Sequence, residues 1–200
     1  MQDSGEVLVK EIEKGYLFDG PGDENAIIFY PGGLVDYRAY APLMQQIAGT
    51  GIDCFLVRMN YNLAFFGINK AQELQIDYSY RNWYMMGHSL GGVAAASYAA
   101  GHLEELTGII FLASYPTKSL QADGFRALSV YGSNDGLVDR GAIEESREKM
   151  PEDYREVCIE GGSHAQFGNY GSQKKDGVPT INASEVQRQT IDAIRDCILR

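Results

Sequence analysis

The chain alternates between short apolar runs and stretches in which apolar residues recur every three to four positions. Short apolar runs are typical of strands that are covered on both faces of a parallel sheet. They occupy 26–30, 52–59, 82–86, 106–113, 127–132 and 154–160. Two more short strands, 7–12 and 15–18, flank a turn, and we expect them to pair in antiparallel fashion at a sheet edge.

In the segments between these strands, apolar residues recur with helical periodicity, which predicts helices there. The expected helices are 37–48, a helix through Ala71, Leu74 and Ile76, the alanine-rich stretch from Ser89 to near Gly101, 141–149 and 184–199. Ser184 is the candidate N-cap of the last helix, whose apolar face carries Val186, Thr190, Ala193, Ile194 and Cys197 or Ile198. Alternating strands and helices predict an α/β fold, a mostly parallel twisted sheet with helices on both faces, in one domain over 1–200.

The length, net charge and apolar runs of the chain limit the class of protein that it can be. Two hundred residues suit one domain with a substantial core. A net charge of −10 lacks the basic footprint of a nucleic-acid-binding protein. No apolar run approaches the roughly 18 residues that cross a bilayer, and the start at Met1 is unlike a signal peptide. The sequence, as given that of a soluble domain, is also compatible with a leader or anchor removed ahead of Met1, and in that case the domain would be extracytoplasmic or anchored to a membrane.

The cysteines Cys54, Cys158 and Cys197 lie far apart in apolar-patterned segments. This odd, scattered set matches neither a disulfide framework nor a zinc-binding spacing. We therefore expect buried structural thiols, and the chemistry described next implies no metal or cofactor.

The stretch with the most specific chemistry is Gly87-His88-Ser89-Leu90-Gly91, a G-x-S-x-G pentapeptide. An apolar run precedes it and the alanine-rich segment follows, so it lies between a strand and a helix. A nucleophile elbow requires that context, because its turn is so tight that neighbouring positions must lack side chains. Ser89 is therefore the candidate nucleophile, and a glycine-rich turn with an incidental serine is the alternative.

A serine hydroxyl needs a base to take its proton and a third group to orient that base. Of the three histidines, His88 lies inside the elbow, where we expect its side chain to point away from the base position. His102 follows the next helix beside acidic residues and is expected to be a solvated surface residue. His164 lies in a glycine-framed loop directly after a strand, where catalytic groups of such sheets gather. His164 is therefore the candidate base.

The candidate acid is Asp135, in the turn-forming sequence Asn134-Asp135-Gly136 just beyond the strand at 127–132. A plain Asx turn is the competing interpretation. Asp139 and Asp123 are weaker candidates because each lies farther from the expected strand end. The chain order Ser89, Asp135, His164 is the order expected of this architecture.

Stabilising the oxyanion of an acyl-transfer intermediate requires two backbone N–H donors. One is expected from Leu90, the residue after the nucleophile. The other should come from the loop Pro31-Gly32-Gly33-Leu34, whose glycines let the backbone approach a substrate. Gly33, or Leu34 next to it, is the candidate.

Four separated motifs, at 30–33, 87–92, 132–136 and 162–168, together resemble the alpha/beta-hydrolase superfamily. They look most like its small capless bacterial group, which is distantly similar to dienelactone hydrolases, and so does the segment 62–69. The resemblance covers nearly the whole chain and implies a largely parallel sheet of about eight strands with a Ser–Asp–His esterase-type triad. Pro31 departs from the pattern, because many members carry a His-Gly oxyanion motif there. The stretch between 113 and 127 is also too short for a cap domain.

These residues favour a carboxylesterase-type serine hydrolase that acts on small or short-chain esters through an acyl-enzyme. An acyltransferase, thioesterase or peptidase would use the same triad, and a non-catalytic binding protein of this fold is less favoured because no triad member is missing. Without a cap, Phe65 and Phe66, together with Phe167 beside the base, are expected to line an apolar acyl groove. Core packing of Phe65 and Phe66 is the alternative.

Overall fold

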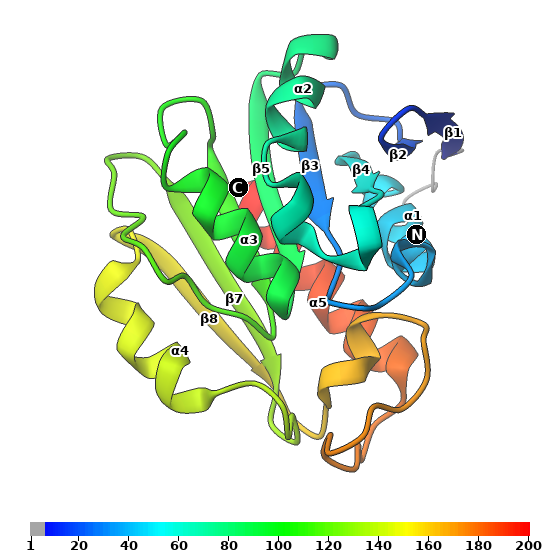
Figure 1. Ribbon diagram of the computed structural model, residues 1–200, viewed down its shortest axis with the longest axis vertical. Helices are drawn as coiled ribbons and strands as arrows, with labels where there is room; N and C mark the ends of the chain where they lie inside the picture. The colour runs from blue at the N-terminus through cyan, green and yellow to red at the C-terminus, as the bar shows by residue number, and fades with distance from the viewer. Residues whose placement is uncertain (1–6) are drawn as a thin grey trace.

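The computed structural model describes residues 7–200, and its centre is one eight-stranded sheet with the strand order β1-β2-β4-β3-β5-β6-β7-β8 (Figure 1). The strands are β1 (Leu8–Ile12), β2 (Gly15–Asp19), β3 (Asn25–Tyr30), β4 (Asp53–Val57), β5 (Asn82–His88), β6 (Gly108–Leu112), β7 (Arg126–Gly132) and β8 (Asp153–Ile159). β2 pairs antiparallel with both β1 and β4, and every pairing from β4 to β8 is parallel. The expected α/β fold with an antiparallel edge is confirmed.

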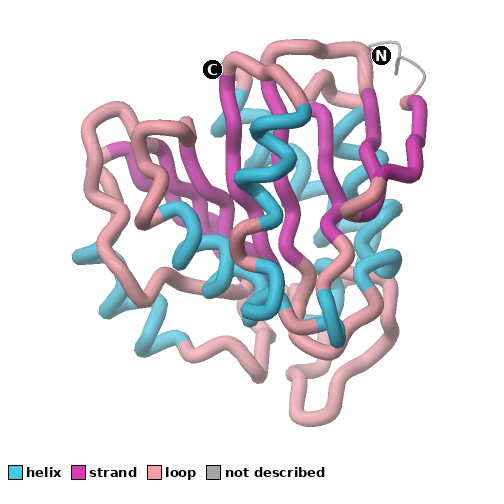
Figure 2. Tube along the Cα trace, turned by 45° about the horizontal axis from the view of Figure 1, so that its top comes forward, coloured by secondary structure: helices cyan, strands magenta, loops and turns pink. Residues whose placement is uncertain are grey.

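Helices cover both faces of this sheet (Figure 1). α1 (Ala41–Ala48) and α5 (Ala183–Ile198) lie on one face, and α2 (Lys70–Asp77), α3 (Leu90–Ala99) and α4 (Arg140–Ser146) lie on the other. Short 3₁₀ turns occur at Tyr37–Tyr40, Asn60–Asn62, Ala64–Gly67, Arg147–Lys149 and His164–Phe167. Loops from the carboxyl ends of the parallel strands gather at one end of the sheet (Figures 1 and 2), which is the end where ligands bind in such folds.

The central strands are apolar at successive positions because both of their faces are buried. In β3, Ile28 packs into the core beneath α2 and α3, while Ile27 and Phe29 pack into the core beneath α1 and α5. All three side chains are fully buried. Alternation of side chains across a strand thus divides one apolar run between two cores.

Several local expectations were wrong at their edges. The segment 37–48 is a 3₁₀ turn followed by α1, because Pro42 lies in the first turn of α1, where its missing N–H costs no helical hydrogen bond. In α2, Ala71 and Leu74 are buried, but Ile76 is 77% exposed and lies outside this buried face. α5 begins one residue earlier than expected, and its N-cap is Asn182, whose Oδ1 accepts from Glu185 N at 2.8 Å. Ser184 therefore lies inside the helix.

Cys158 is exposed, which corrects the expectation of three buried thiols. It lies on β8, the edge strand, where part of the strand's surface faces solvent. Residues 113–125 join β6 to β7 without a separate cap domain within the described chain. None of the helices in residues 7–200 combines the length and apolar character of a membrane span.

Candidate active site

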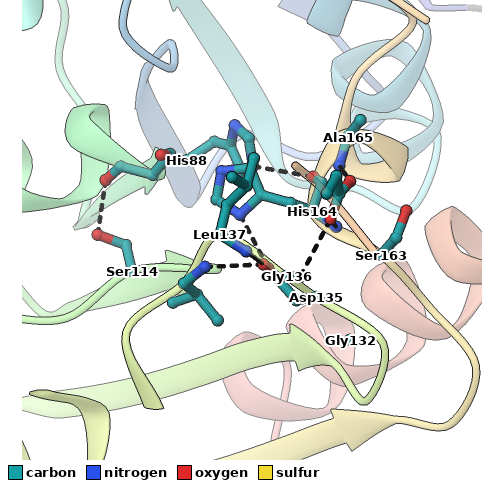
Figure 3. A network of polar contacts seen from close by, with 12 residues as sticks. His88, Ser114, Gly132, Asp135, Gly136, Leu137, Ser163, His164 and Ala165 are labelled. Atoms are coloured by element: carbon teal, nitrogen blue, oxygen red, sulfur yellow. Dashed lines mark hydrogen bonds and ion pairs between the residues drawn. The ribbon is translucent and has the colours of Figure 1, made fainter. Parts of the chain in front are cut away.

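Ser89 lies at the sharp junction between β5 and α3. Its backbone has φ 51° and ψ −125°, which is strained for a residue with a side chain. The Ser89 N–H donates to Leu112 O at 2.9 Å, and Ser114 Oγ donates to Ser89 O at 2.7 Å (Figure 3). Neighbouring strands and loops therefore hold this strained residue through both of its peptide groups.

The glycines of the pentapeptide make this turn sterically feasible. A Cβ atom on Gly87 would lie 2.5 Å from Gly91 C and O. A Cβ atom on Gly91 would lie 2.3 Å from the carbonyl oxygens of Tyr30 and Pro31. Both contacts are with backbone, which cannot rotate away, so the close approach of elbow, helix and β3 requires glycine at both positions.

Asp135 and His164 form a buried pair at the carboxyl ends of β7 and β8. Asp135 Oδ2 lies 2.8 Å from His164 Nδ1, and their side chains are 0% and 4% exposed. The other carboxylate oxygen accepts from the N–H groups of Leu137 and Val138, both at 2.8 Å. Because an ionised carboxylate only accepts, Nδ1 carries the ring proton, and Nε2 of the neutral imidazole is left as the acceptor.

The two weaker candidates for the acid, Asp139 and Asp123, do not contact His164. Asp139 is the N-cap of α4, where its Oδ1 accepts from Ala142 N at 3.0 Å. Asp123 is exposed in the turn before β7, at the opposite end of that strand from Asp135. Of the three aspartates considered, Asp135 alone contacts His164.

The other two histidines differ from expectation. His102 is half-buried rather than solvated, with its ring stacked 4.0 Å from that of Tyr98 and Nδ1 2.8 Å from Tyr98 O. His88 lies against His164 instead of pointing away from it, with their ring centroids 4.6 Å apart. Burial, reinforced by the neighbouring His164, lowers the pKa of His88 well below its usual value. His88 is therefore neutral at physiological pH.

The candidate oxyanion donors differ in whether their N–H groups already donate a hydrogen bond. The N–H of Leu34 donates to Asn62 O at 2.8 Å, so Leu34 was the wrong alternative. The N–H groups of Gly33 and Leu90 donate no hydrogen bond to any of residues 7–200. The two residues also adjoin, since a Cβ atom on Gly33 would lie 3.0 Å from Leu90 Cδ2. Gly33 and Leu90 are the pair of free donors beside Ser89.

The three candidate phenylalanines divide into two groups. Phe65 and Phe66 are 45% and 62% exposed, which contradicts the core-packing alternative. Phe167 is fully buried, with its ring 5.7 Å from that of His88, so it cannot line a groove as expected. We define the apolar rim as six half-buried or exposed side chains from residue 34, the segment 61–66 and the start of α3, which are Leu34, Tyr61, Leu63, Phe65, Phe66 and Leu90. Of these, Leu63 and Leu90 lie beside Gly33.

The sequence analysis did not identify Tyr40 and Asp176 as site residues. Tyr40 Oη lies 2.8 Å from His88 Nδ1, and it accepts from Gly32 N at 3.2 Å. Asp176 accepts hydrogen bonds from His164 N and Ala165 N, at 3.2 and 2.9 Å. In the sequence, Tyr40 belongs to a helical apolar face and Asp176 to a polar loop, so neither pattern indicates these contacts. No group of three or more His, Cys, Asp or Glu side chains among residues 7–200 could hold a metal ion.

Comparison with known proteins adds a family and a set of similar structures. A family model described as "Alpha/beta hydrolase family" matches residues 26–189, which span the whole candidate site. A search of curated proteins found no match. Among solved structures, the chain is similar to a "predicted CIB-like hydrolase" from Thermoplasma acidophilum, with 16% identity, a TM-score of 0.66, and coverage of 96% of this chain and 100% of the other.

Two other solved structures have the same architecture. Dienelactone hydrolase from Anabaena variabilis has 16% identity and a TM-score of 0.66, over 96% of this chain and 97% of the other. Alpha/beta hydrolase domain-containing protein 10 from mouse has 15% identity and a TM-score of 0.64, over 97% and 98%. At these identities, the similarity establishes a common fold.

Proposed function

Because the chain belongs to the alpha/beta hydrolase family, we propose that it is a carboxylesterase-type serine hydrolase acting on small or short-chain esters. The family and the fold support hydrolase activity in general. The observation that carries the finer proposal is the buried Asp135–His164 pair, 2.8 Å apart, at the same sheet edge as the strained elbow of Ser89. Nucleophile, base and orienting acid then come from three separate strand ends.

In the proposed reaction, Ser89 Oγ attacks the ester carbonyl while His164 Nε2 takes the hydroxyl proton. Asp135 holds the ring in the Nδ1–H tautomer and stabilises the imidazolium that forms. The tetrahedral intermediate collapses as His164 returns the proton to the leaving alcohol, and Ser89 remains acylated. His164 then deprotonates a water molecule, which attacks the acyl group. The second tetrahedral intermediate collapses as His164 returns this proton to Ser89 Oγ, and the carboxylic acid is released.

The free N–H groups of Gly33 and Leu90 are proposed to stabilise the oxyanion in both tetrahedral intermediates. Ser89 Oγ makes no hydrogen bond within residues 7–200. Catalytic hydrogen bonds often shorten only once a substrate is bound, so the Ser89–His164 bond is expected to form in that complex. A neutral His88 suits this chemistry, because a second cation beside His164 would oppose formation of the imidazolium.

The apolar rim is the proposed contact surface for the acyl group. Phe66 packs edge-to-face on Tyr61, with ring centroids 5.8 Å apart, and Leu34 is joined to the same loop through its hydrogen bond to Asn62. Leu34, Tyr61 and Asn62 all have positive φ angles, and such backbone strain is concentrated at functional sites in proteins. With Phe65 and Phe66 exposed and no cap, a short acyl chain would lie on this surface rather than in a closed tunnel.

The test combines covalent labelling with steady-state kinetics. A fluorophosphonate probe should label Ser89, and Ser89→Ala should lose that labelling together with several orders of magnitude in kcat on p-nitrophenyl butyrate. Ser97→Ala is the matched control, because it removes a serine hydroxyl from α3 whose one hydrogen bond within residues 7–200 is to Val93 O. Retained labelling or wild-type turnover in Ser89→Ala would refute the proposed nucleophile.

A further inference from the structure

The loop at 169–182 lies against two other loops, the acid loop at 133–139, which carries Asp135, and the base loop at 160–168, which carries His164. Within it, the carboxylate of Asp176 accepts hydrogen bonds from four backbone N–H groups. The donors are Gly136 at 3.2 Å, His164 at 3.2 Å, Ala165 at 2.9 Å and Gly177 at 2.8 Å. One donor therefore comes from the acid loop, directly after Asp135, and two come from the base loop seen in Figure 3.

Backbone packing fixes the same loop against the acid loop. A Cβ atom on Gly136 would lie 2.7 Å from Gly177 N and Lys175 O, and one on Gly177 would lie 1.8 Å from Asn134 O. Glycine is therefore required on both sides of the contact. The Asn134 side chain adds a hydrogen bond from Nδ2 to Val178 O at 2.9 Å.

The loop is also held to the base loop. Gln166 Nε2 donates to Ile181 O at 2.7 Å, and Thr180 N donates to Gly161 O at 2.9 Å. Asp176 thus lies where the 169–182 loop, the acid loop and the base loop meet.

The bonding of Asp176 is that of an ionised group. Partial burial opposes its ionisation, but the four N–H donors outweigh this, and they hold the pKa of the carboxyl below its usual value. Asp176 makes no ion pair within residues 7–200, so backbone amides alone balance its charge. A carboxylate can accept from this many donors at once, whereas an amide has one acceptor oxygen and two donors of its own.

We propose that Asp176 is a positioning residue, which acts through Asp135 and His164 by locking the acid loop to the base loop. The acid and the base lie on separate loops, and their 2.8 Å contact depends on how these loops are placed. A displacement of about 1 Å in a catalytic group can cost on the order of 10²-fold in rate. This inference rests on the proposed function, because it assigns Asp176 a role in the same reaction.

The kinetic test uses Asp176→Asn and Asp176→Ala, with Asp53→Asn as the matched control. Asp53 also accepts a backbone N–H, from Gly20 at 2.8 Å, but it lies at the start of β4, at the opposite end of the sheet. We expect both Asp176 variants to lose about 10²-fold in kcat while KM changes less than about threefold. Asp53→Asn should keep wild-type kcat. In a protein that already carries Asp135→Asn, adding Asp176→Asn should lower kcat by less than about a further twofold, because both residues act through His164.

A second readout does not depend on ester hydrolysis. Long-range ¹H–¹⁵N spectra of histidine-labelled protein report the tautomer of His164, which should be Nδ1–H in the wild type and mixed in the Asp176 variants. If Asp176→Ala does not fold, the milder Asp176→Asn carries both measurements. Variants that lower only the melting temperature, with kcat and the His164 tautomer unchanged, would overturn the positioning role. A changed tautomer in a protein whose Ser89→Ala variant keeps full activity would instead overturn the proposed nucleophile.

Discussion

Nε2 of His88 lies 3.2 Å from the main-chain oxygen of His164. Because a carbonyl oxygen only accepts, Nε2 of His88 must carry the proton, and Nδ1 of the neutral ring accepts from the hydroxyl of Tyr40. The Tyr40 oxygen in turn accepts from Gly32 N. These hydrogen bonds join the loop at 31–34 to the loop that carries His164, through the residue next to Ser89.

Removing the Tyr40 hydroxyl, which lies in the middle of this series of hydrogen bonds, should destabilise the fold. Tyr40→Phe leaves Gly32 N–H and His88 Nδ1 without their partner in a fully buried position. We expect a loss of about 1–3 kcal/mol in the free energy of unfolding, measured by urea denaturation. Tyr61→Phe is the control, since Tyr61 is 83% exposed, and it should stay within about 0.5 kcal/mol of the wild type. Equal stabilities for the two variants would contradict a structural role for the Tyr40 hydroxyl.

The choice between the two nearby carboxylates can be tested by an isosteric change. Asp135→Asn places an amide beside His164 Nδ1, which favours the wrong imidazole tautomer and should lower kcat by about 10⁴-fold. Asp139→Asn should leave kcat close to the wild-type value, because asparagine caps a helix as well as aspartate does. Steady-state kinetics on one ester ranks the two variants. A crippled Asp139→Asn with a mild Asp135→Asn would mean that the acid has been assigned to the wrong residue.

The parts of the molecule that could be predicted from sequence depend on local patterns. Alternating apolar runs and helical periodicity predicted the layered sheet, because burial on both faces dictates the composition of each strand. The candidate Ser89 follows from a pentapeptide whose Gly87 is required by a contact within the elbow and whose Gly91 is required by the close approach of Tyr30 and Pro31. Asp135 and His164 could be selected by their position after strands, and the structure brings them into contact.

The predictions that were wrong concern side-chain direction and partners that lie far away in the chain. Phe167 turns into the core because a capping box between Ser163 and Gln166 shapes the 3₁₀ turn that carries it. The N–H of Leu34 is satisfied by Asn62, a contact between two loops that no local pattern encodes. The roles of Tyr40 and Asp176 likewise arise only when separate loops meet.

Acid should destabilise the β8 edge of the sheet through Glu156. Its carboxylate accepts from Arg147 Nε at 2.9 Å, Tyr131 Oη at 2.6 Å and Tyr154 Oη at 3.0 Å. The Arg147 hydrogen bonds, with help from the tyrosines, outweigh burial and lower the pKa of Glu156 from 4.5 to about 2. A depressed folded-state pKa means that this stabilisation is complete above pH 4.5 and is lost as the pH falls toward 2.

Glu156→Gln should therefore lower the free energy of unfolding at pH 7 by on the order of 1 kcal/mol, a value reduced by partial solvent screening. The difference from the wild type should shrink as the pH falls from 4.5 toward 2, measured by urea denaturation at several pH values. Glu152→Gln is the control, because Glu152 is an exposed residue near the same edge with no hydrogen bond or ion pair within residues 7–200. A deficit in Glu156→Gln that stayed constant down to pH 2 would rule out this linkage.

Substrate preference should follow from the shape of the apolar rim. Burying a methylene group gains about 0.8 kcal/mol, but only while a surface is available to cover it. Phe65, Phe66 and Leu90 are themselves 45%, 62% and 38% exposed, and the described chain has no cap to close over them. Carbons beyond the rim would therefore remain in water, and longer acyl chains would gain little from binding.

We expect kcat/KM on p-nitrophenyl esters to be highest for acyl chains of about two to four carbons, since longer chains find no further apolar surface. Phe66→Ala should reduce kcat/KM for the butyrate ester more than for the acetate ester, because only the longer chain reaches the rim. Ile76→Ala serves as the control, since it removes a side chain of similar exposure from α2, outside the rim, and should change neither value. Without a lid, activity should also not increase at the concentration where a long-chain ester forms micelles. A steep increase there would mean that a segment of the chain covers Ser89 in water and moves away at a lipid surface. That result would contradict the prediction of an open site.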